Sequence, residues 1–446
     1  MYKKSVAFFC LVLVISFPLF SQSNEGFQFH RPKKKSYKIP FKNYNNLIII
    51  KAKLNGVPMN LLLDTGVNNT ILFGIKGNEE QIKKNSQKIL ISGVSGKKKT
   101  YAYKNENNTL EIDNLKNENQ DIYLIFDKEF NVSDKIGYQI QGIIGYDFFK
   151  DLVVKVNYIR NYLKVYNPDQ FSKKLRRYDK LDFKLINQKP YIKTKIKQQD
   201  GIFEDYVFLL DIGSGDAVWL KPQSDQSLPQ KSFEDILGYG FADIISGLRS
   251  KAEALKLGRK TINDLKVAYP DSLSYKGLKF TSKSGVIGSE IMRRFHWFFN
   301  YPEREVYFKP NSDIADVFNY DMSGLLLKYD GYQAITTYQS LFPDVKAQTD
   351  NRSGYNKISK QLSNVMVEMK PILKIGAIRP NSSAFEAGFI EGDRIVKING
   401  RAAYRYDLER ISKLLCSEEG LKVNFEIERN GSYYEKSLTL KSRFLE

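Results

Sequence analysis

The same short pattern occurs twice in the chain: an apolar run ends in an aspartate, and a glycine follows two residues later. The first copy is Leu61-Leu62-Leu63-Asp64-Thr65-Gly66 and the second is Phe208-Leu209-Leu210-Asp211-Ile212-Gly213. An apolar strand delivers the carboxylate at its end, and the glycine lets the backbone turn there. Two such strands in one chain predict a site built from a pair of carboxylates.

Each aspartate pattern belongs to a longer repeat. An alternating segment and a turn come before it and predict a hairpin, Leu47 to Leu63 in the first copy and Pro190 to Leu210 in the second. An apolar-apolar-glycine segment comes after it, Ile143-Ile144-Gly145 in the first copy and Val286-Ile287-Gly288 in the second. Two further strands follow each of these glycines. The ordered repetition predicts a mostly β fold with internal pseudo-symmetry.

The repeat resembles the retropepsin-like aspartic peptidases, in particular those of bacterial exported proteins. The resemblance covers roughly residues 36–310 and implies two closed-barrel-like lobes, residues 36–168 and 178–310. In that family each lobe supplies a D-[ST]-G loop, with the apolar-apolar-glycine segment beside it. The resemblance implies that Asp64 and Asp211 are catalytic and that the residues supporting them are Thr65, Gly66, Gly213 and Ser214. Because one chain carries both aspartates, we expect a monomer.

Two facing aspartates favour one chemistry. Carboxylates that share one proton cannot both ionise easily, so the pair can activate a water and protonate a carbonyl oxygen. The expected reaction is hydrolysis of a peptide or unfolded protein, without a cofactor. We expect no metal site either, because the chain contains no HExxH, CxxC or clustered carboxylate ligand set. Only two histidines, His30 and His296, are available for nucleophile chemistry, and neither lies in a suitable pattern.

The second copy departs from the family pattern. The family has Thr or Ser after each aspartate, where the hydroxyl bonds to the opposite loop; Thr65 matches this and Ile212 does not. The residue after the glycine often donates a hydroxyl to the carboxylate, which Ser214 can do and Val67 cannot. A second hypothesis therefore stays open, in which the chain is a peptide-binding scaffold with impaired catalysis.

A substrate flap is expected downstream of Asp64. Two strand-like arms flank a glycine-containing turn, so Gly93, Val94, Ser95 and Gly96 are the predicted flap tip. The corresponding segment of the second copy is 238–247. An ordinary solvent-exposed hairpin is an equally good interpretation of either segment.

Residues 320–446 are similar to a PDZ domain. The similarity rests on a strand from Ile372, a short helix that ends at Ala387-Gly388, and the Gly392-Asp393 and Asn399-Gly400 turns. It implies that a glycine-led loop, Gly324-Leu325-Leu326-Leu327, binds the terminal carboxylate of a peptide ligand. Residues 328–370 are expected to be an insertion. A docking or structural module without a free ligand is the alternative.

The first residues of the chain predict where the protein is located. Residues 1–21 have the pattern of a secretory signal, with Lys3 and Lys4 before an apolar core that is too short for a membrane span. We therefore expect export to the periplasm or the exterior of a Gram-negative bacterium, with no membrane span after the signal is removed.

The formal charge of +19 comes from lysines spread along the chain, so no nucleic-acid partner is expected. Cys416 is then the only cysteine, and packing is its expected role.

Overall fold

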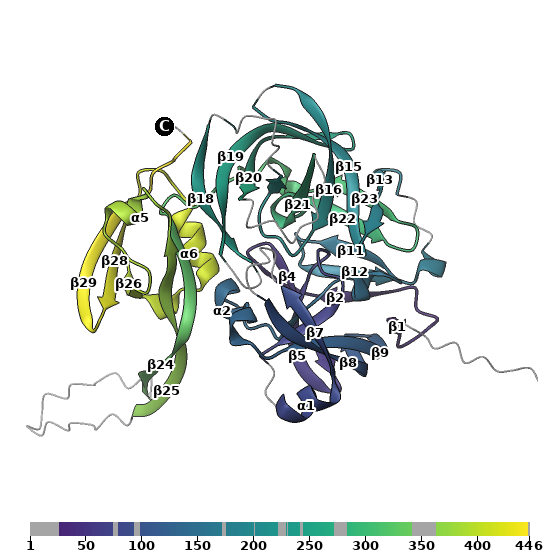
Figure 1. Cartoon of the computed structure of the whole chain (residues 1–446), viewed down its shortest axis with the longest axis horizontal. Coiled ribbons are helices and arrows are strands. Elements are labelled where there is room, and N and C mark those ends of the chain that lie inside the picture. Colours follow the sequence, from purple (N-terminus) through teal and green to yellow (C-terminus); the bar gives the residue numbers. More distant parts are fainter. Residues whose placement is uncertain are drawn as a thin grey trace, which may run out of the picture.

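The computed structural model describes residues 26–74, 79–92, 99–171, 175–199, 201–221, 229, 231–240, 244–271, 283–340 and 363–444. The described part of the chain is mostly β and is arranged in four sheets (Figure 1). The predicted signal at residues 1–21 lies outside it. Within the described residues, no helix has the length and apolar character needed to cross a membrane.

The nine-stranded sheet that carries Asp64 is called lobe 1, with its attached helices. Its elements are β1 (Gln28–Phe29), β3 (Lys42–Tyr44), β4 (Leu47–Leu54), β5 (Val57–Leu63), β6 (Thr70–Phe73), α1 (Glu79–Asn85), β7 (Gln87–Ser92), β8 (Lys99–Ile112), β9 (Leu115–Ile125), α2 (Ser133–Ile136), β10 (Gly142–Ile144) and α3 (Tyr146–Phe149). The strand order is β1-β9-β6-β10-β5-β4-β8-β7, with β3 beside β4. β10 runs parallel to β5, with Ile144 opposite Leu63, and antiparallel to β6. The glycine segment therefore lies between the strand that enters the Asp64 loop and the strand that leaves it.

The eight-stranded sheet that carries Asp211, called lobe 2, repeats this arrangement. Its elements are β14 (Lys184–Ile186), β15 (Lys189–Lys197), β16 (Phe203–Asp211), β17 (Val218–Leu220), β18 (Ser232–Tyr239), β19 (Ile244–Leu257), β20 (Lys260–Pro270), β21 (Ser284–Gly288) and α4 (Ser289–Met292). The strand order is β14-β15-β16-β21-β17-β20-β19-β18. β21 runs parallel to β16, with Ile287 opposite Leu210, and antiparallel to β17. The repeated order of motifs in the sequence thus corresponds to a repeated strand topology.

A six-stranded sheet joins the two lobes and is called the shared sheet. Its strands are β2 (Ser36–Pro40), β11 (Val153–Asn157), β12 (Tyr162–Tyr166), β13 (Asp179–Asp182), β22 (Phe295–Asn300) and β23 (Glu305–Pro310), in the order β13-β23-β22-β11-β12-β2. The central pair, β11 and β22, comes from the two repeats and is antiparallel. Trp297 and Phe299 of β22 and Phe149 of α3 are fully buried, in one apolar core that extends through both lobes. Each such side chain contributes roughly 1.5–3 kcal/mol by burial, so the shared sheet fixes the lobes relative to each other.

The C-terminal domain has its own sheet and its own apolar core. Its elements are β24 (Leu325–Ser340), β25 (Ser363–Ile378), α5 (Ser383–Glu386), β26 (Arg394–Ile398), β27 (Arg401–Ala402), α6 (Leu408–Leu415), β28 (Lys422–Arg429) and β29 (Ser432–Thr439). The strand order is β24-β25-β26-β28-β29, with β27 beside β26. Asp407 caps α6 by accepting a hydrogen bond from the Arg410 amide, 2.8 Å long. The described parts of the expected insertion, 328–340 and 363–370, are the extended arms of β24 and β25.

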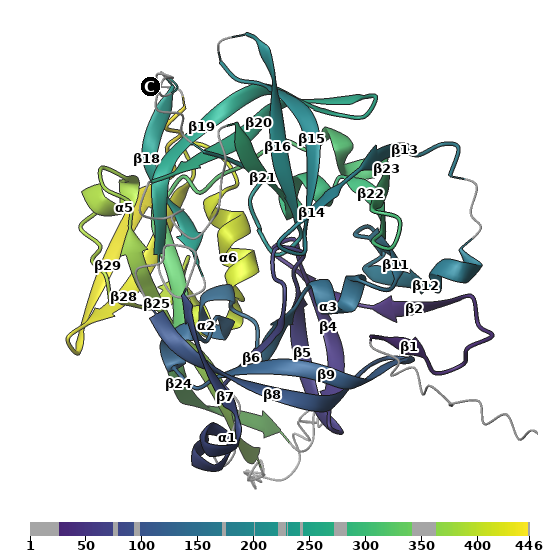
Figure 2. The same cartoon turned by 45° about the vertical axis from the view of Figure 1, so that its right-hand side comes forward.

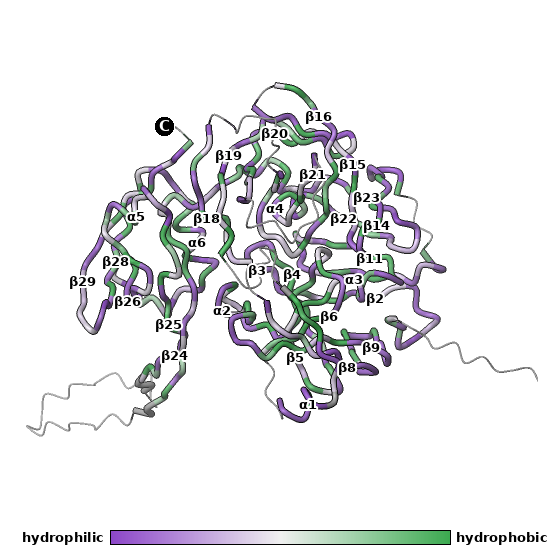
Figure 3. The backbone as a smooth tube through the Cα atoms, viewed as in Figure 1, coloured by the Kyte–Doolittle hydropathy of each residue, from purple (hydrophilic) through white to green (hydrophobic). Residues whose placement is uncertain are grey.

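The C-terminal domain lies beside β18 and α2, on the side of the lobes away from the shared sheet (Figures 1 and 2). It contacts lobe 1 through the Glu409 amide, which donates to the Tyr44 hydroxyl over 3.2 Å, and through Gln139, whose amide donates to the Tyr332 hydroxyl over 2.8 Å. Apolar stretches follow the packed strands, and the outer turns are mostly polar (Figure 3). The domain is therefore held against both lobes.

Candidate active site

The carboxyl groups of Asp64 and Asp211 hydrogen-bond to each other between the two lobes. A Cβ atom on Gly66 would lie 2.7 Å from Oδ2 of Asp211 and 3.0 Å from Oδ1 of Asp64. A Cβ on Gly213 would overlap the Asp64 carboxyl group. Both glycines are therefore required because the carboxyl group of the opposite loop lies against their backbone.

Backbone amides fix the orientation of both carboxyl groups. The Gly66 amide donates to Oδ1 of Asp64 over 2.7 Å, and the Gly213 amide donates to Oδ1 of Asp211 over 2.9 Å. The Ser214 amide also donates to Oδ1 of Asp211, over 3.2 Å. Ser214 was expected to reach the carboxylate through its hydroxyl; the observed contact comes from its backbone instead. Such rigid support is what a catalytic pair requires.

Thr65 links the two aspartate loops. Its buried hydroxyl donates to the carbonyl oxygen of Leu210 over 2.6 Å and accepts from the Ile212 amide over 3.0 Å. One side chain thus satisfies a donor and an acceptor on either side of Asp211. The Ile212 side chain has no hydroxyl to return the contact, and it is fully buried in the apolar core. The side chain of Thr65 in lobe 1 therefore contacts the backbone of the lobe 2 loop, and Ile212 makes no equivalent contact in return.

The glycines of the apolar-apolar-glycine segments are explained by close packing against the aspartate loops. A Cβ atom on Gly145 would overlap the carbonyl oxygens of Val67 and Asp64, and one on Gly288 would overlap that of Asp216. Neither position has a positive φ angle. The lack of space for a Cβ atom therefore demands glycine at both positions.

The protonation of the pair follows from its surroundings. Burial and the neighbouring Asp211 carboxyl group raise the pKa of Asp64 well above its ordinary value. Burial also raises the pKa of Asp211, while hydrogen bonds from Asp64 and from the Gly213 amide oppose that rise. Two carboxyl groups in this arrangement favour the state in which they share one proton, and they titrate as a unit.

A buried ion network supports the Asp211 loop, and sequence reasoning missed it. The Asp216 carboxylate accepts hydrogen bonds from Nη1 of Arg249 over 2.6 Å and from Nε1 of Trp219 over 3.0 Å, and Nζ of Lys266 lies 3.3 Å away. Burial alone would raise the pKa of Asp216, but Arg249 and Lys266 hold it well below its usual range. Arg249 and Lys266 lie on β19 and β20, far along the chain from Asp216. No local sequence pattern connects these residues.

A second missed feature is an acid two residues after the glycine of each repeat. In lobe 1, Asp147 accepts hydrogen bonds from the amide and hydroxyl of Thr70, both 2.9 Å, and from Gln120 over 3.0 Å. In lobe 2, Glu290 occupies the same place and pairs with Lys266 at 2.9 Å. The shared position of Asp147 and Glu290 in the two copies was the signal that could have revealed this feature.

The predicted flap is described only at its base. β7 and β8 pair antiparallel as the two arms of a hairpin, and β18 and β19 pair likewise in lobe 2. The predicted tip residues Gly93, Val94, Ser95 and Gly96 lie outside the described residues, as do residues 241–243. Their role stays a prediction.

The predicted carboxylate-binding loop of the C-terminal domain already binds a carboxylate of its own chain. The Gly324 amide donates to Oδ1 of Asp321 over 2.6 Å, and the Leu325 amide donates to the Ser323 hydroxyl over 3.0 Å. Leu326 and Leu327 continue into β24. The first two amides of the loop are thus engaged within the chain.

Comparison with protein families agrees with this geometry. Residues 50–148 match the aspartyl protease family. Residues 374–429 match a PDZ domain. The aspartyl protease match includes the Asp64 loop and Gly145, and it ends before lobe 2. A search of curated proteins finds no match to the chain.

The similarity to aspartyl proteases bears on both aspartate loops. Of the two aspartates, the matched region contains Asp64 alone. In the structure, Asp211 of the second repeat lies beside Asp64. The C-terminal domain, whose core contains Ile375, Ile395 and Ile427 from neighbouring strands, is the PDZ domain.

Proposed function

We propose that the protein is an exported aspartic endopeptidase. The observation that carries this proposal is the hydrogen bond between the closely approaching Asp64 and Asp211 carboxyl groups, each held by the amide of the glycine two residues later. The aspartyl protease match over residues 50–148 supports the same assignment. Export rests on the pattern of residues 1–21, and activity as a monomer rests on the presence of both aspartates in one chain.

The pair hydrolyses a peptide bond without a covalent intermediate. The ionised carboxyl group takes a proton from a water molecule while the protonated one donates its proton to the carbonyl oxygen of the substrate. The water oxygen bonds to the carbonyl carbon to form a tetrahedral gem-diol. The carbon–nitrogen bond then breaks: the protonated carboxyl group gives its proton to the leaving nitrogen, and a gem-diol hydroxyl gives its proton to the ionised carboxyl group as it becomes the new carboxylic acid. The pair thus returns to its starting state with one shared proton. Asp64 and Asp211 act as a unit in these steps.

The substrate class is a peptide or an unfolded protein, bound beneath the hairpin predicted to end at Gly93 to Gly96. The PDZ domain would add peptide or partner binding to this activity, with Gly324 to Leu327 as its predicted loop. Cleavage of a mixed peptide library by the full chain at acid pH tests the proposal. Activity should fall to background in Asp64→Asn and in Asp211→Asn, and a statine-type inhibitor should block the wild type. Cleavage that persists in both variants would exclude this mechanism.

A peptide-binding scaffold with impaired catalysis is the second candidate, and Ile212 is the observation that favours it. Titration of the wild type with fluorescent peptides, with product formation followed in the same samples, separates the two functions. Saturable binding without product supports the scaffold. Binding followed by cleavage supports the peptidase.

A further inference from the structure

One face of β18, the outer strand of the lobe 2 hairpin, lies against the C-terminal domain. Phe233, near the start of β18, packs against Tyr320 and Phe444 at ring-centroid distances of 5.6 and 5.2 Å. Near the end of β18, the Tyr239 hydroxyl lies so close to Gly376 that a Cβ atom on that glycine would overlap it. The strand is therefore in contact with this domain at both ends.

Between these ends, Arg379 of the C-terminal domain reaches Asp235 of β18. Arg379 is only 3% exposed, and its Nε lies 3.4 Å from Oδ1 of Asp235. Its Nη2 donates to the carbonyl oxygen of Asp321 over 2.7 Å, and its guanidinium lies over the Phe233 ring at 5.2 Å. Arg379 is thus buried at the joint between the C-terminal domain and lobe 2.

Asp235 continues the contact into lobe 2. Its Oδ2 accepts a hydrogen bond from Nε of Arg249 over 3.0 Å. The same Arg249 donates to Asp216, in the loop that begins at Asp211. Alternating charges therefore run from Arg379 through Asp235 and Arg249 to Asp216. The side chains along this path are 3–12% exposed, so removal of one charge leaves its neighbour buried without full compensation.

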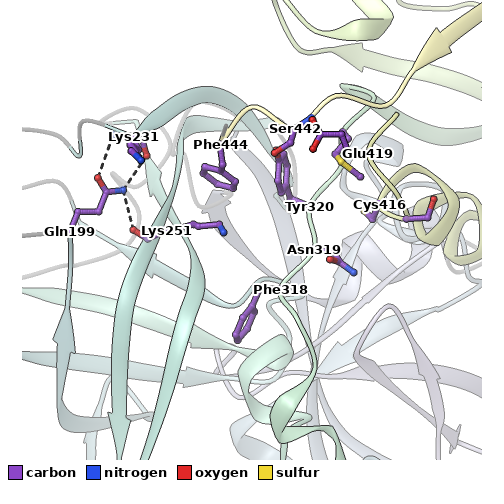
Figure 4. A pocket seen from close by; sticks show the side chains of 12 residues that line it. Gln199, Lys231, Lys251, Phe318, Asn319, Tyr320, Cys416, Glu419, Ser442 and Phe444 are labelled. Carbon is purple, nitrogen blue, oxygen red and sulfur yellow. Dashed lines mark hydrogen bonds between the residues drawn. The ribbon is translucent and has the colours of Figure 1, made fainter. Parts of the chain in front are cut away.

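The interface between lobe 2 and the C-terminal domain also contains a cavity. A cavity of about 420 Å³ lies between lobe 2, the segment that links it to the C-terminal domain, and the end of the chain (Figure 4). Lys231 and Lys251 line its lobe 2 side, and Tyr320 and Phe444 line it with rings 4.8 Å apart. The contacts of β18 therefore lie beside a cavity, and they add to the hydrogen bonds that the C-terminal domain makes with lobe 1.

The hairpin of lobe 1 differs. Leu90 on β7 is 55% exposed and Tyr101 on β8 is 46% exposed, so the arms of this hairpin have uncovered apolar side chains. β18 has Phe233 buried and Asp235 paired at the corresponding place in lobe 2. The two hairpins are thus unequally restrained.

We propose that the C-terminal domain supports one half of the peptidase site, and that Arg379 is a positioning residue that aligns the Asp211 loop through Asp235, Arg249 and Asp216. The described strands of the lobe 2 hairpin are fixed by this contact. This inference rests on the proposed peptidase function for its kinetic part only. Its structural part, the restraint of β18, stands independently of catalysis.

The test uses the full chain and two readouts. Hydrogen exchange of the backbone in residues 232–239 is measured without substrate, and kcat and KM are measured with a cleavable peptide. Arg379→Gln should increase exchange in this segment and lower kcat at least about tenfold with little change in KM, because displacement of a catalytic group is costly. Arg379→Lys, which keeps the charge near Asp235, should recover part of both effects.

Matched variants separate positioning from general destabilisation. Arg394→Gln removes an arginine that pairs with Glu428 inside the C-terminal domain, 2.6 Å apart, and it should leave exchange in residues 232–239 and kcat unchanged. Gly376→Ala displaces Tyr239 without a change of charge and should increase exchange near the end of β18. Should Arg379→Gln fail to fold, Arg379→Lys and Gly376→Ala decide the question.

The outcomes distinguish this inference from the proposed function. If the wild type does not cleave peptides, the peptidase proposal fails and the exchange measurements still decide whether β18 is restrained. Unchanged exchange in Arg379→Gln and Gly376→Ala would overturn the inference. Increased exchange with an unchanged kcat in an active enzyme would overturn the positioning role of Arg379.

Discussion

The hydroxyl of Thr65 donates a hydrogen bond of 2.6 Å to the carbonyl oxygen of Leu210, the residue before the second aspartate of the pair. The same hydroxyl accepts from the amide of Ile212, the residue after it. One side chain of lobe 1 thus holds both ends of the opposite aspartate. The register of the pair is maintained although the reciprocal hydroxyl is missing from lobe 2.

Removal of the Thr65 hydroxyl is expected to loosen the pair. Thr65→Val keeps the shape but leaves the Leu210 carbonyl and the Ile212 amide without a partner, at a cost of about 1–3 kcal/mol. The free energy of unfolding should fall by that amount in urea denaturation, and kcat should fall at least about tenfold. Thr261→Val, at an exposed site on β20, is the control and should change neither. Full activity in Thr65→Val would show that the loops need no such link.

Introduction of the missing hydroxyl tests whether one link suffices. Ile212→Thr removes a buried ethyl group worth about 1.6 kcal/mol, and a new hydrogen bond can offset about 1 kcal/mol of this loss. We therefore expect the free energy of unfolding to change by no more than about 1 kcal/mol and kcat/KM to change less than about tenfold. Measurement of both quantities beside wild type decides this. A much larger gain in kcat/KM would favour the interpretation of the natural chain as a catalytically impaired scaffold.

Gly145 packs so closely against the Asp64 loop that the methyl group of an alanine there should lower stability. A Cβ atom there overlaps the backbone of the Asp64 loop, so Gly145→Ala should lower the free energy of unfolding by about 1–3 kcal/mol and displace Asp64. Thermal unfolding and peptide cleavage should both report the change. Gly215→Ala is the matched control, because its nearest neighbour would be the Asn45 carbonyl oxygen at an ordinary 3.6 Å. Equal behaviour of the two variants would contradict the packing described for Gly145.

The raised pKa values of Asp64 and Asp211 predict how stability depends on pH. A carboxyl group with a raised pKa binds its proton more tightly in the folded state. Its contribution to stability is complete below the ordinary Asp pKa of about 3.9 and is lost as the pH rises through the folded value. Asp64→Asn removes the burial of this charge and its repulsion from Asp211, so it should be more stable than wild type at neutral pH.

Thermal unfolding across pH 3–8 checks the sign of this difference. The advantage of Asp64→Asn should shrink as the pH falls toward about 4. Asp205→Asn, at an exposed site on β16, should follow wild type throughout. A variant less stable than wild type at neutral pH would contradict the buried pair.

Local rules were enough to predict a mostly β fold with an aspartate at the end of an apolar strand in each repeat. Asp64 and Asp211 follow apolar strands, and the glycines after them were recognisable because each repeat supplies the same order of motifs. The strand pairings of β5 with β10 and of β16 with β21 follow that order. Repetition thus carried the information that a single short motif lacks.

Long-range ion pairs could not be predicted in this way. Arg249 and Asp216 are 33 residues apart, and Arg379 meets Asp235 across a domain joint. Charged residues on strands look alike in sequence whether they face solvent or a buried partner. Only the packing of β18 against the C-terminal domain selects Asp235 and Arg379 as partners.

The segment 328–370 shows a second limit of prediction from sequence. It was expected to be an insertion, and sequence reasoning did not predict that its described parts, 328–340 and 363–370, pair as antiparallel arms. Tyr332, Val367 and Met369 on these arms are exposed, so apolar residues at these positions do not mark a buried face. Backbone pairing between β24 and β25 joins the two described arms.

The most direct test of the central claim is kcat/KM for one cleavable peptide, measured across acid and neutral pH for wild type, Asp64→Asn and Asp211→Asn. If the two aspartates share one proton and act as a unit, wild-type activity should be highest at acid pH and decline as the second carboxyl group ionises. Each asparagine variant should be at background at every pH. Cleavage that persists in either variant, or a wild-type profile without this decline, would contradict catalysis by the Asp64–Asp211 pair.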